Sequence, residues 1–169
     1  MTVTDPQMPL KPPLGRPPKE LLSSSSHLLK RLGWVVKERA AGAFESTGLS
    51  PYHYAVLALL EEEPRETQAT IADALGYDRS HLVGLLDELE ERSLIDRRRD
   101  PSDRRRHLVS LTSEGRRALK RLRSVVKRVD EDFLAPLDDE QREALHALLL
   151  LLASHHEPRY AVSERSDGS

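Results

Sequence analysis

Residues 67–112 decide the fold, and they read TQATIADALGYDRSHLVGLLDELEERSLIDRRRDPSDRRRHLVSLT. Thr67 is a good N-cap, and Ile71 and Leu75 follow at the four-residue spacing of one helix face. Gly76 comes next, and glycine is the residue that most easily takes the left-handed conformation at the end of a helix. Together these signals predict one short helix that begins after Thr67 and ends at Gly76.

A second, longer helix is predicted directly after this turn. Asp78 is its candidate N-cap, and leucines at helical spacing mark a buried face. The opposite face of this helix is the candidate recognition surface, and it carries Arg79, Ser80, His81, Val83, Gly84 and Asp87. Gly84 in the middle of a helix costs about 1 kcal/mol relative to alanine. Close approach to DNA or to another helix would explain its presence.

Beyond Arg92 the pattern changes from the helical period to that of short strands. Residues 94–97 and 107–111 are predicted strands, because they contain the β-branched Ile95 and Val109. The connection between them has turn residues at 100–103 and a cluster of cations, namely Arg98, Arg99, Arg104, Arg105 and Arg106. So basic a hairpin repels itself unless a polyanion lies nearby. Two helices, a tight turn and a basic hairpin predict a winged helix-turn-helix, which places a helix in a DNA groove.

Five short motifs occur in a fixed order around this region. They are LSP at 49–51, IADALG at 71–76, LEER at 89–92, DPSDRR at 100–105 and LTSEG at 111–115. In order and spacing, the run from Leu49 to about Leu119 resembles the MarR family of transcription regulators. The resemblance implies a homodimeric repressor that binds a pseudo-palindromic operator in double-stranded DNA. Each copy of the second motif helix is then expected to enter one major groove.

The resemblance also implies roles for single residues. Asp103 and Arg105 match the family's Asp-x-Arg wing motif, so Asp103 is expected to orient Arg105 towards the minor groove. A small effector, aromatic or anionic, is expected in a cleft beside the DNA lobe, with Trp34, Tyr52 and His53 as candidate pocket residues. From the residues alone, Trp34 is better explained as a core or dimer-interface anchor than as a pocket residue, and His53 also suits a surface or capping position.

The distribution of charge supports a polyanionic partner better than the total does. The chain of 169 residues has a net charge of −2, with 32% charged residues. From residue 92 to 128, however, there are 14 lysines and arginines and 4 acidic residues, a net of +10. From residue 129 to the end there are 3 and 10, a net of −7. Such asymmetry indicates a basic binding surface.

The remaining segments are expected to frame this lobe in a mainly α-helical protein with a small β-hairpin wing. Residues 1–20 are rich in proline and are expected to form no helix, remaining a disordered or extended arm. Residues 21–48 and 113–156 are expected to form dimerisation helices around a DNA-binding lobe at 49–112. The last helix is too rich in leucine for a monomer to cover, and residues 157–169 are expected to be a frayed tail.

Other classes of function find less support in the sequence. There is no cysteine, the seven histidines show no metal-binding spacing, and no glycine-rich phosphate loop or apolar membrane span is present. The expectations are therefore no enzymatic activity, no cofactor, no membrane and a cytoplasmic location. Two alternatives stay open, namely a winged-helix module for protein interaction and a DNA-binding regulator without an effector. The many arginines of the hairpin argue against the first.

Overall fold

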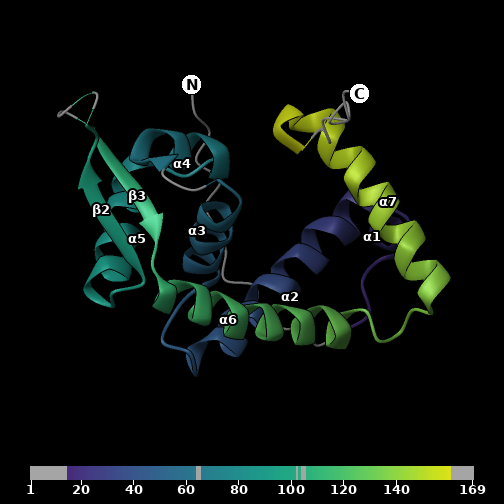
Figure 1. Ribbon diagram of the computed structural model, residues 1–169. Helices are drawn as coiled ribbons and strands as arrows, with labels where there is room; N and C mark the ends of the chain where they lie inside the picture. The colour runs from purple at the N-terminus through teal and green to yellow at the C-terminus, as the bar shows by residue number, and fades with distance from the viewer. Residues whose placement is uncertain (1–14, 64–65, 102, 104–105, 161–169) are drawn as a thin grey trace, which may run out of the picture. The chain divides into compact units, whose positions relative to one another are not determined.

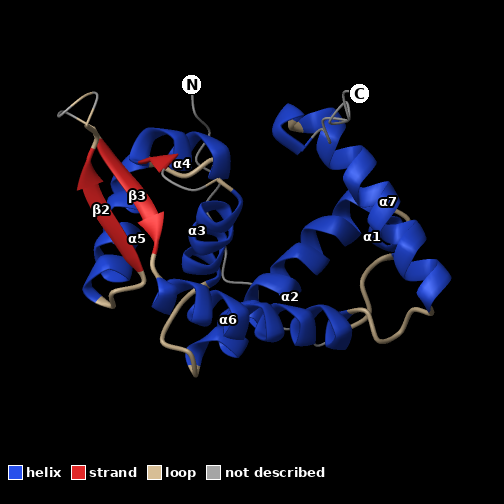
Figure 2. Ribbon diagram, viewed as in Figure 1, coloured by secondary structure: helices blue, strands red, loops and turns tan. Residues whose placement is uncertain are grey.

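The computed structural model describes residues 15–63, 66–101, 103 and 106–160. Within them the chain is mostly helical, with one small antiparallel sheet (Figure 2). This confirms the predicted fold class. The chain divides into two compact units, one ending at Lys37 and the other starting at Glu38, and the border falls inside a helix.

Figure 1 labels the seven helices and the strands β2 and β3 of the described residues. The helices are α1 (Lys19–Leu22), α2 (Ser25–Glu45), α3 (Pro51–Glu62), α4 (Gln68–Leu75), α5 (Arg79–Glu91), α6 (Ser113–Phe133) and α7 (Asp139–His156), followed by the 3-10 turn η1 (Pro158–Tyr160). The strands are β1 (Glu66–Thr67), β2 (Ile95–Arg99) and β3 (His107–Leu111).

Helix caps determine where the central helices begin and end. Thr67 forms a capping box with Thr70 at the start of α4, and Gly76 ends that helix with a φ of 67°. Asp78 caps α5 and Thr112 caps α6, both through side-chain oxygens that accept backbone N–H groups. These bonds satisfy helix-end donors that have no partner within the helix. The helix-turn-helix predicted from the sequence is thus confirmed.

The wing belongs to a sheet of three strands rather than two. Its order is β1-β3-β2, and β1 contributes only Glu66 and Thr67, opposite Val109 and Leu108. Strand β1 was not predicted, because two residues are too few to show an alternating pattern. Strand β2 begins at Ile95 and continues into the arginine run, two residues beyond the predicted end, since pairing with β3 extends along it.

Apolar side chains from the helices α2 to α6 and from β2 and β3 meet in one core. The fully buried residues include Val56, Leu57 and Leu60 of α3, Ile71 of α4, Leu82, Leu86 and Leu89 of α5, Val109 of β3, and Leu119 and Leu122 of α6. Helix α6 joins this core closely at Gly115, where an added Cβ would lie 2.0 Å from the carbonyl oxygen of Leu94. The core therefore fixes α5 and the sheet on α3 and α6.

Two expectations about the ends of the chain were wrong in part. The proline-rich arm was expected to form no helix up to about residue 20, but α1 begins at Lys19, directly after Pro18. The tail was expected to fray from residue 157, but η1 covers Pro158–Tyr160, and Ser154 Oγ donates to the Tyr160 carbonyl over 3.1 Å. Residues 1–14 and 161–169, which the expectations also covered, lie outside the described residues.

No helix in the described part of the chain combines the length and the apolar character that crossing a bilayer requires.

Candidate nucleic-acid interface

The first turn of α5 is held rigidly by Asp78. Its Oδ1 accepts the backbone N–H of Ser80 over 2.8 Å and that of His81 over 3.3 Å. The Ser80 hydroxyl also donates to the same oxygen. These hydrogen bonds, led by the one from the Ser80 hydroxyl, hold the pKa of Asp78 below its ordinary value. The start of α5 is therefore fixed by hydrogen bonds to its own N-cap residue.

The outer face of α5 is open to solvent, as predicted for a recognition helix. Arg79, Ser80, His81, Val83 and Gly84 are all exposed, on the side of the helix opposite the buried leucines. Val83 is 42% exposed, and an added Cβ at Gly84 would have no neighbour within 4 Å outside its own helix backbone. An apolar side chain and a bare backbone at this face suit contact with a groove.

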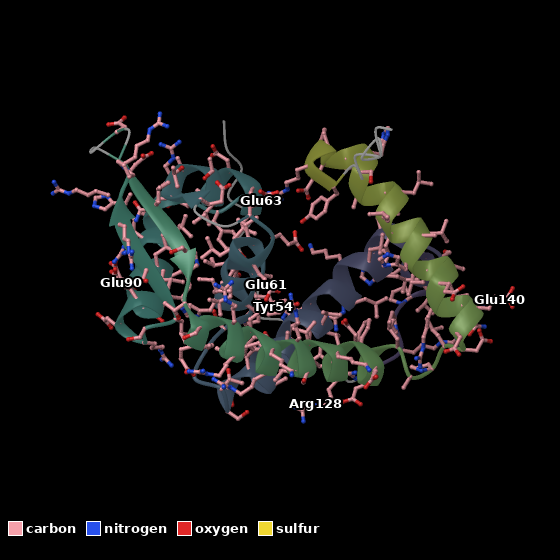
Figure 3. All side chains as sticks on the ribbon, viewed as in Figure 1. Tyr54, Glu61, Glu63, Glu90, Arg128 and Glu140 are labelled. Carbon is pink, nitrogen blue, oxygen red and sulfur yellow. The ribbon has the colours of Figure 1, made fainter. Side chains whose placement is uncertain are left out.

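The sixth predicted residue of this face, Asp87, is already engaged. Its Oδ1 accepts a hydrogen bond from Arg97 Nη2 over 2.6 Å. The same guanidinium donates to Glu90 through Nε over 2.8 Å and through Nη2. Figure 3 labels Glu90 at this place on α5. Arg97 on β2 thus joins the wing to α5. The two carboxylates raise the pKa of Arg97 above the ordinary value of an arginine, and the hydrogen bond to Glu90 is the largest cause.

Arg97 was missing from the predicted wing residues, although it stands in the arginine run. Its side chain is 19% exposed, whereas that of Arg98 is 82% exposed. Alternation along β2 separates the two, since neighbouring residues of a strand point to opposite faces. The alternation could be predicted from the sequence, but Asp87 and Glu90 on α5 were not predicted as partners of Arg97.

The remaining described wing cations face solvent. Arg98 contacts Asp96 at 3.4 Å, Arg99 is exposed, and Arg106 Nε lies 3.6 Å from Asp103 Oδ2. The backbone N–H of Arg106 also donates to the Asp103 carbonyl, which closes the turn. Arg104 and Arg105 lie outside the described residues, so the expected pairing of Asp103 with Arg105 stays a prediction.

A cluster of three rings supports the start of α5. The rings of Tyr52, Tyr77 and His81 meet edge to face, with centroids 5.4 to 6.3 Å apart. Burial raises the pKa of Tyr77, and nearby Tyr52 contributes less. His81 was predicted as a base-contacting residue, and Tyr52 as a pocket residue. The ring cluster joins α3 to α5 while both side chains remain exposed, so their predicted contacts with bases and with an effector stay predictions.

The other two candidate pocket residues lie in different compact units. Trp34 is in α2 before the unit border, where the Arg31 guanidinium stacks over its ring at 5.5 Å. His53 in α3 is buried, with 5% of its surface exposed. A hollow of about 360 Å³ also lies beside α6, lined by Tyr54, Arg123, Val126, Lys127, Asp130, Glu131, Leu134 and Arg142. Neither Tyr52 nor His53 lines it, so the predicted pocket residues and this hollow are distinct.

The lobe from α3 to the wing is similar to a known family of proteins. The family model described as the MarR family matches residues 49–107, the segment from the start of α3 to the wing. A relative from Thauera aromatica, described as a putative transcriptional regulatory protein for the hcr operon, is 33% identical over 145 residues. The match covers 80% of this chain and 87% of the relative. The chain belongs to the MarR family. The predicted resemblance and the predicted role as a transcriptional regulator are confirmed.

Solved structures of MarR-type repressors share its fold. The repressor CouR bound to a 23-mer DNA duplex is 36% identical and superposes with a TM-score of 0.74, over 80% of this chain and 96% of that one. CouR from Rhodococcus jostii RHA1 bound to p-coumaroyl-CoA is 34% identical with a TM-score of 0.70, over 83% and 97%. Members of this MarR family thus occur with DNA and with a small molecule.

Proposed function

We propose that this MarR-family protein is a homodimeric repressor that inserts α5 into the DNA major groove. The observation that carries this proposal is the exposed outer face of α5 beside a strand of exposed arginines, with Arg97 bridging the two. Arg79, Val83 and Gly84 are assigned to the base edges, and Ser80 can still accept a hydrogen bond while its own proton is donated to Asp78.

The wing is assigned to the DNA backbone. Arg98, Arg99 and Arg106 are exposed cations at one end of the sheet, and Arg104 and Arg105 follow in the same connection of the sequence. Arginines placed this way bind phosphates or a narrow minor groove without specifying every base. Their positive charge therefore supports affinity and salt dependence, whereas α5 supplies sequence preference. The arginines also favour DNA binding over a protein-interaction module.

Dimerisation is assigned to the helices outside the lobe. In α7 the side chains of Leu148, Leu149, Leu151 and Leu152 are 40% to 66% exposed, and in α2 Leu28, Leu29 and Leu32 are 41% to 49% exposed. Apolar faces of this extent are costly in water unless a partner covers them. A symmetric dimer would cover both, and it would present two α5 helices to half-sites about 34 Å apart on the DNA.

Release by a small effector is the second part of the proposal. It is supported by CouR, which is solved both with DNA and with p-coumaroyl-CoA. An effector acts only if it binds one arrangement of the dimer more tightly than another. We further assign the protein no catalytic activity, because a transcriptional regulator needs none. We assign it a cytoplasmic place of action, because regulation of transcription requires access to DNA.

Selection from a random-sequence duplex library tests the proposal. The wild-type protein should enrich a pseudo-palindromic site, and the selected duplex should bind a dimer with an affinity that falls steeply with salt. Enrichment of no sequence, together with a flat salt profile, would refute DNA reading by α5 and the wing. A screen of aromatic acids and their coenzyme A thioesters for a raised melting temperature then tests for an effector.

A further inference from the structure

His53 stands out within the described residues as the one polar side chain that is buried. It lies in the first turn of α3, yet its ring reaches from the cap of that helix to α5. Its two nitrogens face different partners, Ser50 on one side and Glu88 on the other. The proposed DNA contacts, the wing and the hollow make no use of it.

The Nδ1 side fixes the protonation state of the ring. Nδ1 accepts the backbone N–H of Ser50 over 3.0 Å and lies 2.9 Å from the Ser50 hydroxyl. A backbone N–H can only donate, so Nδ1 carries no proton. The neutral ring therefore has its hydrogen on Nε2. The capping box of α3 thus selects the tautomer that points a donor at the recognition helix.

The Nε2 side faces Glu88 without a completed hydrogen bond. Nε2 lies 3.2 Å from Glu88 Oε2, which is ion-pair distance, but the atom has no hydrogen-bond partner of good geometry within the described residues. We take the contact as electrostatic, since direction matters as much as distance for a hydrogen bond. The Glu88 side chain is 57% exposed and can turn to complete the bond.

Burial and the charges around the ring act on the pKa of His53 in different directions. Burial is the main reason that the pKa of His53 lies below 6.5, and nearby Arg92 and His81 lower it further, while Glu88 opposes them. The Arg92 guanidinium also approaches the turn between α2 and α3, where it would lie 3.0 Å from a Cβ at Gly48. The cap of α3 and Glu88 of α5 therefore meet at one imidazole, and Arg92 approaches the turn that precedes that cap.

We propose that His53 is a positioning residue for DNA binding, whose buried ring ties the cap of α3 to Glu88 and so sets the orientation of α5. The residue touches no DNA and acts through Glu88. A shift at the start of α3 would be passed to α5 along this connection. The inference rests on the proposed use of α5 as the recognition helix.

Two amide substitutions test the roles of Nδ1 and Nε2 of His53 separately. In His53→Gln the side-chain amide nitrogen can occupy the place of Nε2, whereas in His53→Asn the shorter amide reaches only the place of Nδ1. Affinity for the duplex selected by the wild-type protein should stay within about twofold in His53→Gln. It should fall roughly three- to tenfold in His53→Asn, at the low end of couplings between contacting residues because Glu88 is half-exposed. Circular dichroism establishes that each variant is folded at the binding temperature.

A double-mutant cycle with Glu88→Ala tests the connection itself. Glu91→Ala is the matched control, because Glu91 is an exposed glutamate on the same helix and its replacement removes the same charge. Glu88→Ala should bind three- to tenfold more weakly than Glu91→Ala, and it should add nothing further to His53→Asn.

Equal losses in His53→Gln and His53→Asn, or no loss in either, would overturn the inference. If both His53 variants are unfolded, Glu88→Ala and Glu91→Ala with equal affinities would overturn it. A wild-type protein that selects no duplex would instead refute the proposed function, and the inference with it.

Discussion

Substitution of Arg97 tests whether the wing is joined to α5 by this side chain. Arg97→Lys keeps the positive charge but replaces a planar fork with a single ammonium that cannot reach Asp87 and Glu90 in the same geometry. Three hydrogen bonds join the guanidinium to the two carboxylates. The expected result is a loss of stability with no change of net charge.

The size of the expected stability loss in Arg97→Lys follows from how exposed Asp87 and Glu90 are. A buried hydrogen bond to a charged group contributes about 1.5–3 kcal/mol, whereas an exposed ion pair contributes about 0–1 kcal/mol. Arg97 is 19% exposed, but Asp87 and Glu90 are 50% and 42% exposed, so solvent weakens the network. We expect a total loss of about 1–2 kcal/mol, which for a chain of this length lowers the melting temperature by about 2–8 °C.

Arg98→Lys is the matched control on the same strand. Arg98 is 82% exposed and contacts Asp96 at 3.4 Å, so its replacement should leave the melting temperature within about 1 °C. Thermal unfolding followed by circular dichroism measures both variants. If Arg97→Lys and Arg98→Lys melt at the same temperature as the wild type, Arg97 does not hold the wing and the reasoning fails.

Four further results are expected. Gly84→Ala should raise stability by up to about 1 kcal/mol in denaturant titration, because the position is open, yet weaken binding to the selected duplex if α5 approaches the groove closely. Gly115→Ala should destabilise by about 1–3 kcal/mol in the same assay, because its Cβ would overlap the carbonyl oxygen of Leu94. Since the pKa of His53 is lowered on folding, the neutral ring stabilises the fold above pH 6.5 and this contribution is lost as the pH falls through the folded pKa. The melting temperature should therefore drop between pH 7 and 5 by more in the wild type than in His53→Gln. Leu151→Glu should convert the proposed dimer to a monomer, as measured by light scattering, because Leu151 is 66% exposed, the most of the leucines on the apolar face of α7. A dimer of unchanged stability would contradict this prediction.

Local signals in the sequence predicted the lobe well because they are strong and close together. Thr67, Gly76 and Asp78 each satisfy or end a helix through bonds to residues at most four positions away. Such bonds need no knowledge of the tertiary structure. The bounds of α4 and the start of α5 were accordingly predicted to the residue.

Interactions over longer distances were not accessible from the pattern. Strand β1 exists only because Glu66 and Thr67 pair with β3, about forty residues further along the chain. The partners of Arg97 lie seven and ten residues away on another element, so an arginine among arginines gave no sign of its different role. His53 was predicted as a surface, capping or pocket residue, and the structure confirms the capping position. Its burial and its approach to Glu88 could not be predicted, because they depend on the packing of α5 against α3.

The central claim is that α5 specifies sequence while the wing supplies affinity. It is tested most directly by titrating Val83→Ala and Arg98→Ala against the selected duplex and a scrambled one at two salt concentrations. Val83→Ala should weaken binding to the selected duplex alone. Arg98→Ala should weaken binding to both and lower the salt slope by about one for each phosphate that the arginine no longer neutralises. Equally weakened binding to both duplexes for Val83→Ala, or unchanged affinities for Arg98→Ala, would contradict the account.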